Sequence, residues 1–271
     1  MAKDRKRWLV EPGKTVKLAR LKSGSTAGAP GDKEATEAAF PEMWPRLHDL
    51  QERLWAEAER SLLVVVQAMD AGGKDGTIEH VFRGMNPQGV RVASFKVPTD
   101  DELAHDFLWR VHQHAPRRGE IGVFNRSHYE DVLIVRVHEI VPEKVWRPRY
   151  EHIRAFERLL VDSGTTIVKL YLHISADEQR QRLQARLDDP AKRWKFRRAD
   201  LDERKRWDDY RAAFEEAISE TSTKDAPWYV VPADRKWYRN WAVLRILTET
   251  LEAMDPRFPE PEEDLSGVVV E

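Results

Sequence analysis

Short apolar runs alternate with amphipathic stretches along most of this sequence. The apolar runs are rich in β-branched residues, which is typical of strands buried on both faces of a parallel sheet. We expect strands over 61–67, 89–95, 120–125, 165–174 and 228–232. The amphipathic stretches predict helices over 32–60, 77–82, 99–114, 175–187 and 236–254. Segment 132–140 fits a helix or a strand and is left open.

The order of these elements predicts the fold class. Strands that alternate with helices indicate an α/β fold with a doubly wound, mostly parallel sheet. Capping boxes at 99–102 and 175–178 mark the expected starts of two helices. We expect residues 1–60 to form an N-terminal arm and a helix that pack on the core. The core would span 61–254, and the Pro- and Glu-rich tail, 255–271, would be loose.

Composition excludes several classes of protein. The chain has 271 residues, of which 41% are hydrophobic and 34% charged, as in globular proteins with a charged surface. A net charge of −2 provides no general field for nucleic acid, so an anion site must be local. No apolar run approaches the ~20 residues of a membrane span. The absence of cysteine excludes disulfides and cysteine-bound metals, and it fits a cytoplasmic location.

A glycine-rich segment, 67–77, follows the first expected strand and reads Gln-Ala-Met-Asp-Ala-Gly-Gly-Lys-Asp-Gly-Thr. Glycines allow backbone N–H groups to surround an anion, and the following helix start adds positive potential. Lys74 would reach the outer phosphates. Asp70 would supply a carboxylate to Mg²⁺, because Asp75 replaces the usual Ser or Thr. The expected phosphate-binding residues are Ala71, Gly72, Gly73, Asp75, Gly76 and Thr77. The alternative is an ordinary strand–helix turn with an exposed lysine.

Two further segments carry candidate chemistry. Arg126 follows the third expected strand and would stabilise charge on a transferring phosphoryl group, unless it is a solvated loop residue. Residues 191–198 hold five basic side chains and no acid. Such a run suits a lid that closes over phosphates, at about 186–211, although an ordinary solvated charge run fits as well.

Taken in order, these motifs resemble the family-two polyphosphate kinases, in particular the branch that phosphorylates nucleoside mono- and diphosphates. The resemblance extends from about Val10 to Asp255. It rests on the segments 67–77, 86–89, 119–131, 187–196 and 226–234.

The resemblance implies a P-loop core of the thymidylate-kinase type with a helical lid. It implies reversible, Mg²⁺-dependent transfer of the terminal phosphoryl group of inorganic polyphosphate to AMP and ADP, with Mn²⁺ as an alternative metal. ATP and guanine nucleotides would be further ligands. The N-terminal arm and the tryptophan-rich surface suggest a homo-oligomer, and neither nucleic acid nor membrane is expected as a partner.

By position, the resemblance assigns roles to individual residues. Asp70 would be the metal ligand and, with Lys74, Arg126 and Arg186, a catalytic residue. Asn125, which stands where other branches have Asp, and Glu130 would lie on the nucleotide side. The polyphosphate track would consist of Lys192, Arg193, Lys195, Arg197 and Arg198. An ATP-dependent nucleoside monophosphate kinase is the alternative function, and a non-catalytic polyanion-binding protein is the alternative class.

Overall fold

A five-stranded parallel sheet forms the centre of the molecule. The computed structural model describes residues 4–266 and 268–270. The strands lie in the order β2-β3-β1-β4-β5, and every neighbouring pair is parallel. Their bounds are β1 Ser61–Ala68, β2 Val90–Ser94, β3 Ile121–Asn125, β4 Thr165–His173 and β5 Trp228–Pro232. All five expected strands are therefore confirmed, and so is the α/β fold class.

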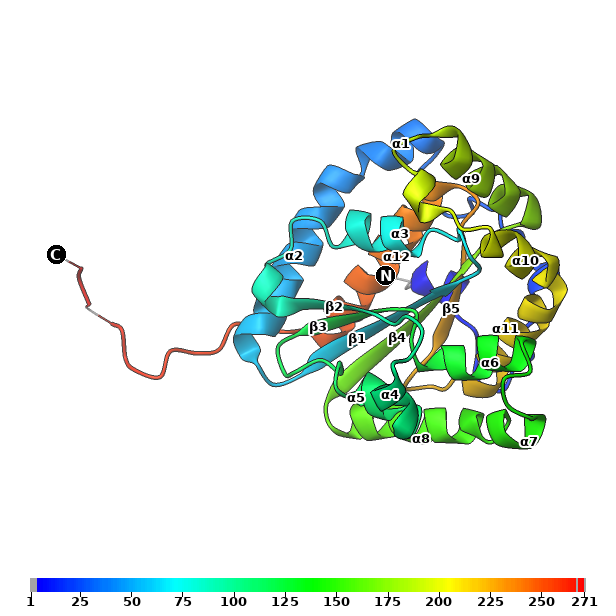
Figure 1. Cartoon of the computed structure of the whole chain (residues 1–271). Coiled ribbons are helices and arrows are strands. Elements are labelled where there is room, and N and C mark those ends of the chain that lie inside the picture. The colour runs from blue at the N-terminus through cyan, green and yellow to red at the C-terminus, as the bar shows by residue number, and fades with distance from the viewer. Residues whose placement is uncertain (1–3, 267, 271) are drawn as a thin grey trace.

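Helices cover both faces of the sheet, which makes three layers (Figure 1). One layer contains α1 (Lys33–Ala38), α2 (Phe40–Glu57), α3 (Lys74–Val81) and α12 (Lys236–Met254), which pack on one another. The other contains the short helices α4 (Asp100–Ala104), α5 (Trp109–His112), α6 (Ile134–Val137) and α7 (Glu143–Trp146), and the longer α8 (Arg149–Asp162) and α11 (Trp207–Thr221). Helices α9 (Ala176–Asp188) and α10 (Ala199–Lys205) lie beyond the carboxyl ends of the strands (Figure 1).

Several helices differ from the sequence-based expectation. The single helix predicted over 99–114 is wrong: the backbone is extended at His105, and α5 begins only after a turn in which the Asp106 carboxylate accepts from the Leu108 N–H at 3.0 Å. That side chain replaces a helical hydrogen bond and ends the helix. The open segment 132–140 is mainly helical, as α6 and the end of a 3₁₀ turn over His128–Val132. Helix α8 was not predicted.

Of the two predicted capping boxes, one is complete and the other is only half formed. At Thr99 both hydrogen bonds of the box are present. At Ser175 only half is formed, because the hydroxyl accepts from the Glu178 N–H while the Glu178 carboxylate binds Arg182 at 2.7 Å. The Ser175 N–H donates to Asp234 instead. The helix nevertheless begins where it was expected.

The N-terminal arm packs on the body, along the free edge of β5. Leu9 forms an antiparallel bridge with Tyr229, flanked by hydrogen bonds of 2.8 Å from Val10 N to Trp228 O and from Val230 N to Trp8 O. Trp8 is only 4% exposed and packs edge-on against Trp241 of α12. The arm therefore covers the last strand, whereas the residues after α12 leave the body (Figure 1).

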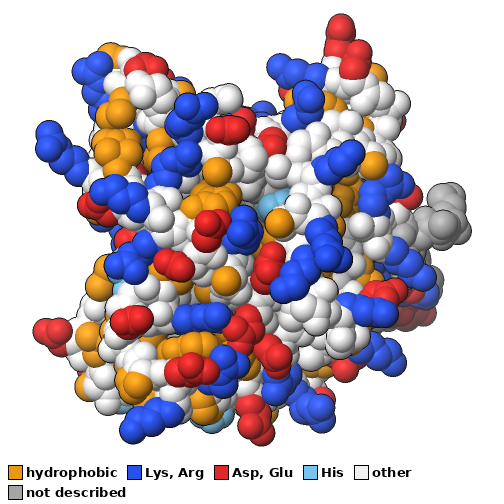
Figure 2. Space-filling view, turned by 90° about the vertical axis from the view of Figure 1, so that its right-hand side faces the viewer, with side chains coloured by type: hydrophobic (Ala, Val, Ile, Leu, Met, Phe, Trp, Pro, Cys, Tyr) orange, Lys and Arg blue, Asp and Glu red, His pale blue; other side chains and the backbone are white. Residues whose placement is uncertain are grey.

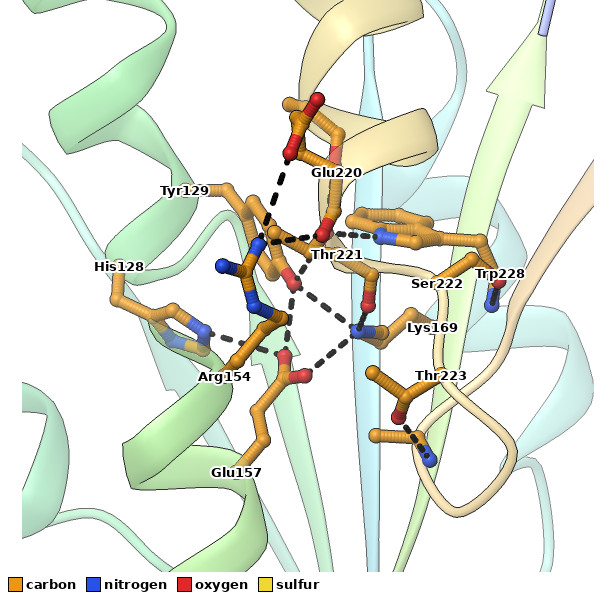
Figure 3. Close-up of polar contacts among 12 residues, drawn as sticks. His128, Tyr129, Arg154, Glu157, Lys169, Glu220, Thr221, Ser222, Thr223 and Trp228 are labelled. Atoms are coloured by element: carbon orange, nitrogen blue, oxygen red, sulfur yellow. Dashed lines mark hydrogen bonds and ion pairs between the residues drawn. The ribbon is translucent and has the colours of Figure 1, made fainter. Parts of the chain in front are cut away.

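A buried polar network joins β4 to the second helical layer (Figure 3). The Lys169 ammonium lies 2.6 Å from Glu157 of α8, and it donates to the Tyr129 hydroxyl at 3.0 Å and to the Thr221 carbonyl of α11 at 2.7 Å. The Tyr129 hydroxyl in turn donates to Glu157 at 2.8 Å. The network fixes the turn that follows Asn125, the last residue of β3, and begins with Arg126, against α8 and α11.

Among the described residues, no helix combines the length and the hydropathy needed to cross a membrane.

Candidate active site

The sheet register brings the two loops with candidate chemistry together. Val66 of β1 lies opposite Asn125, the last residue of β3, so the segments that follow both strands start at the same edge. The Arg126 N–H donates to the Val66 carbonyl at 3.1 Å, which continues the ladder one step further. Ligands of open α/β sheets bind at such an edge, outside the carboxyl ends of the strands.

The loop between β1 and α3 has the backbone of an anion site. Ala71 and Gly73 have positive φ angles, 57° and 96°, and helix α3 begins directly afterwards at Lys74. Alternation of left- and right-handed residues turns successive N–H groups to one side, and a helix start favours negative charge. Residues 69–73 form the loop for which phosphate binding is predicted, with Asp75, Gly76 and Thr77 in the first turn of α3.

Helix α9 supports this loop from behind, which the sequence did not reveal. The Arg182 guanidinium donates to the carbonyls of Ala71 and Gly72 at 3.1 and 3.0 Å. The Gln179 amide donates to the Asp70 carbonyl at 2.9 Å. These bonds to the carbonyls of Asp70, Ala71 and Gly72 hold the shape of the loop, and the Gly72 N–H adds an internal bond to the Met69 carbonyl at 2.9 Å. Arg182 and Gln179 share one face of α9, but nothing in their local sequence indicates a partner more than 100 positions away.

The side chain of Lys74 reaches across the loop, whereas that of Thr77 bonds to the start of its own helix. The half-buried Lys74 ammonium donates to the Ala68 carbonyl at 3.0 Å, across the loop. Burial and the neighbouring charge of Arg126 lower the pKa of Lys74, which an incoming phosphate would reverse. The Thr77 hydroxyl is buried and donates to the Gly73 carbonyl at 2.9 Å, so this side chain stabilises the helix start.

One ion pair and one hydrogen bond connect the loop and the start of α3 with the end of β3. Arg126, at a positive φ of 62°, forms an ion pair of 3.0 Å with Asp70. Asn125 donates to the Asp75 carboxylate at 2.6 Å. Burial opposes charge on Arg126, but Glu130 and Asp70 outweigh it and raise its pKa, so both carboxylates lie within electrostatic reach. The structure therefore brings Asp70, Asp75, Asn125, Arg126 and Glu130 together.

The residues at this edge fit one mode of metal binding. Among the described residues, no cluster of three His, Cys, Asp or Glu side chains is arranged as an all-protein metal site. Mg²⁺ is usually held by one or two carboxylates together with water and substrate phosphates. The half-exposed Asp70 carboxylate beside the phosphate loop suits that mode.

The basic run lies on an exposed stretch between α9 and α10. Its five cationic side chains are solvent-exposed: Lys192, Arg193, Lys195, Arg197 and Arg198. Lys192 pairs with Asp189 at 2.6 Å. Arg186 points toward this stretch, because its guanidinium donates to the Lys195 carbonyl at 3.4 Å. In the view onto the right-hand side of Figure 1, Lys and Arg side chains surround a notch at the top of the face (Figure 2).

A glycine-rich loop after the central strand of a parallel sheet, followed by a helix and lying beside a lysine and an arginine, is the arrangement found in P-loop phosphotransferases. Comparison with known proteins identifies the group within that class. The family model described as Polyphosphate kinase 2 (PPK2) matches residues 31–259, and the chain belongs to this family. The resemblance found in the sequence is thereby confirmed.

Relatives and solved structures agree with this assignment. An AMP/ADP-polyphosphate phosphotransferase of Meiothermus ruber is 58% identical over 98% of this chain and 100% of its own length. An ADP-polyphosphate phosphotransferase of Rhodopseudomonas palustris is 52% identical over 79% of this chain and 78% of its own. The crystal structure of polyphosphate kinase 2 from Arthrobacter aurescens TC1 superposes with a TM-score of 0.92 at 46% identity, covering 95% of this chain and 92% of that one.

Proposed function

We propose that this chain transfers the terminal phosphoryl group of inorganic polyphosphate to AMP and ADP, reversibly. The end-to-end similarity to a protein named AMP/ADP-polyphosphate phosphotransferase carries the proposal. Reversibility follows because the phosphoanhydrides broken and formed are alike. A more distant relative, 31% identical over 88% of this chain, is a GDP-polyphosphate phosphotransferase of Mycobacterium tuberculosis, so guanine nucleotides are included as acceptors.

The reaction needs positioning and charge neutralisation more than covalent chemistry. The loop amides and the start of α3 bind the phosphates of the donor, and the Lys74 ammonium contacts the same phosphates. Arg126 neutralises the oxygens of the transferring group after giving up part of its contact with Asp70. Asn125 and Glu130 border the acceptor side. Arg186 and the five cations of the basic run follow the polymer.

The residues present fit a divalent cation, which we propose to be Mg²⁺, with Mn²⁺ as a substitute. Asp70 would hold it. When bound, the metal would reduce the negative charge of the phosphates. The cytoplasmic location and the homo-oligomeric state stay predictions.

The decisive experiment uses polyphosphate as the sole phosphoryl donor. Purified protein with Mg²⁺ and either AMP or ADP should produce ADP or ATP, measured by chromatography. Product formed only when ATP is the donor would indicate a nucleoside monophosphate kinase instead. Polyphosphate binding without any product would indicate a non-catalytic polyanion-binding protein.

A further inference from the structure

Helix α12 places a buried arginine directly behind the phosphate loop. Arg239 is only 3% exposed. Its Nε and Nη2 atoms donate to the side-chain oxygen of the adjacent Asn240, at 3.1 and 2.8 Å. Among the described residues, Nη1 has no hydrogen-bond acceptor and no carboxylate forms an ion pair with this guanidinium. A buried cation without an anion is unfavourable, and such groups are normally paired.

The free nitrogen of Arg239 lies against the loop itself. A Cβ atom at Gly73 would lie 2.1 Å from Nη1, and one at Gly76 would lie 3.8 Å from Nη2. The guanidinium therefore occupies the space beside the first turn of α3, where the helix favours an anion. Burial and the nearby Arg182 lower the pKa of Arg239 to about 9, so the group still carries its charge at neutral pH.

A second cation continues from this point toward the basic run. Lys236 lies one turn before Arg239 on α12 and is exposed. Partial burial and the charges of Arg182 and Arg239 lower the pKa of Lys236, and Lys192 contributes in the same direction. Lys236 is therefore within electrostatic range of Arg182 and Arg239 beside the loop and of Lys192, the first cation of the basic run.

From this arrangement we propose that Arg239 binds a phosphate held in the loop, and that Lys236 binds the next phosphates of the same chain. The donor polymer would then leave the loop along the first turns of α12 and continue to Lys192. This inference rests on the proposed function, since it assumes a linear inorganic polyphosphate as ligand. The inference adds Arg239 and Lys236 of α12 to a donor site whose other predicted residues lie in the phosphate loop, after β3 and in the basic run.

The test measures equilibrium binding of pyrophosphate and sodium tripolyphosphate by calorimetry, with Mg²⁺ and without nucleotide. Arg239→Met should weaken both about tenfold or more, because a charge-assisted hydrogen bond is lost. Lys236→Gln should weaken tripolyphosphate binding several-fold and pyrophosphate binding little, since the shorter ligand stays within the loop. Arg239→Lys should recover part of the affinity. The control is Arg235→Gln, an exposed cation next to Lys236, which should bind both ligands like the wild type.

The possible outcomes separate this inference from the proposed function. Unchanged dissociation constants in Arg239→Met and Lys236→Gln would overturn the inference alone. So would an Arg239→Met protein that melts at lower temperature yet binds tripolyphosphate normally, because that result describes a structural residue. If the wild type binds neither ligand and makes no nucleotide product from polyphosphate, both the inference and the proposed function are wrong.

Discussion

Two single contacts hold the phosphate loop and the start of α3 against the end of β3. Asp70 lies in the loop and Asp75 in the first turn of α3, and each contacts a side chain at the end of β3: Arg126 and Asn125, respectively. The sequence indicated the residue types at these positions but not the pairing, because about 50 residues separate the partners. Arg182 and Arg239 escaped prediction for the same reason: they follow other strands and reach the loop only through the fold.

Lys74→Ala and Asp70→Asn should each reduce turnover at least about 100-fold, because each removes a charge directed at the phosphates. The measurement is kcat with polyphosphate and AMP. Both proteins should show wild-type circular dichroism, since neither side chain is part of the buried core. A rate close to that of the wild type in either folded variant would contradict the role given to the loop.

Asn125→Asp should lower kcat/KM for AMP and ADP at pH 8, because two carboxylates would then face each other across 2.6 Å. Like charges raise the pKa of one member of such a pair. The loss should therefore diminish as the pH falls toward 6 and one proton is retained.

The matched control reverses the Asn125–Asp75 pair. The double variant Asn125→Asp, Asp75→Asn restores one donor and one acceptor, so it should recover activity at pH 8. If the double variant is no better than Asn125→Asp alone, the contact between β3 and α3 is not what the substitution disturbs.

At the level of elements, strands were easier to predict than short helices. A run such as 61–67 indicates a strand, because it is short, rich in valine and apolar on both faces, as a central parallel strand is. Helix α8 carries a periodic signal, with Ile153, Phe156 and Leu160 at helical spacings, but the charged residues between them obscure it. The break after α4 depends on one Asp106 hydrogen bond, which competes locally with the helix and leaves no periodic signature.

The basic run offers a test of the predicted polymer track. Changing Lys192, Arg193, Arg197 and Arg198 to Gln should raise KM for long-chain polyphosphate strongly and KM for AMP little. The salt dependence of the polyphosphate KM should also become shallower, because fewer counterions are released on binding. Equal losses for donor and acceptor would indicate a lid that closes over both substrates without a separate polymer path.

The buried network around Lys169, which joins β4, α8 and α11, should contribute to the free energy of unfolding. Lys169→Met leaves the buried Glu157 carboxylate without its cation and should reduce the free energy of unfolding by about 3–5 kcal/mol. The double variant Lys169→Met, Glu157→Leu should regain most of that loss. Denaturant unfolding measures both, and equal stability of the single and double variants would contradict the pairing.

The same network gives a pH dependence with a definite sign. Burial alone would raise the pKa of Glu157, but the charge of Lys169, together with hydrogen bonding to Lys169 and His128, outweighs burial and lowers it. A carboxyl group whose folded pKa lies below the unfolded value stabilises the protein at neutral pH, and that contribution is lost as the pH falls through the folded value. Loss of stability in acid should therefore be steeper in the wild type than in the double variant.

On the scale of the whole molecule, the arm connects the first residues with the last strand and the last helix. Trp8→Ala should reduce the free energy of unfolding by about 3–5 kcal/mol, because a large side chain packed between β5 and α12 is lost. Trp194→Ala is the control, since Trp194 is 77% exposed and its removal should leave stability unchanged. Equal effects of the two substitutions would contradict the packing described for the arm.

The pairing of the N-terminal arm with the edge of β5 also has a consequence for synthesis on the ribosome. Trp8 donates a hydrogen bond to Tyr238, a residue 230 positions later in the chain. At the usual ~5–20 residues per second, translation takes roughly 10 to 50 seconds to reach that partner. During this interval Trp8 and Val10 have no native surface to cover, and the nascent arm is available to chaperones or to the β5 edge of another copy whose own arm has detached. Polysomes hold nascent copies of the chain close together, so exchange of arms between subunits would begin there.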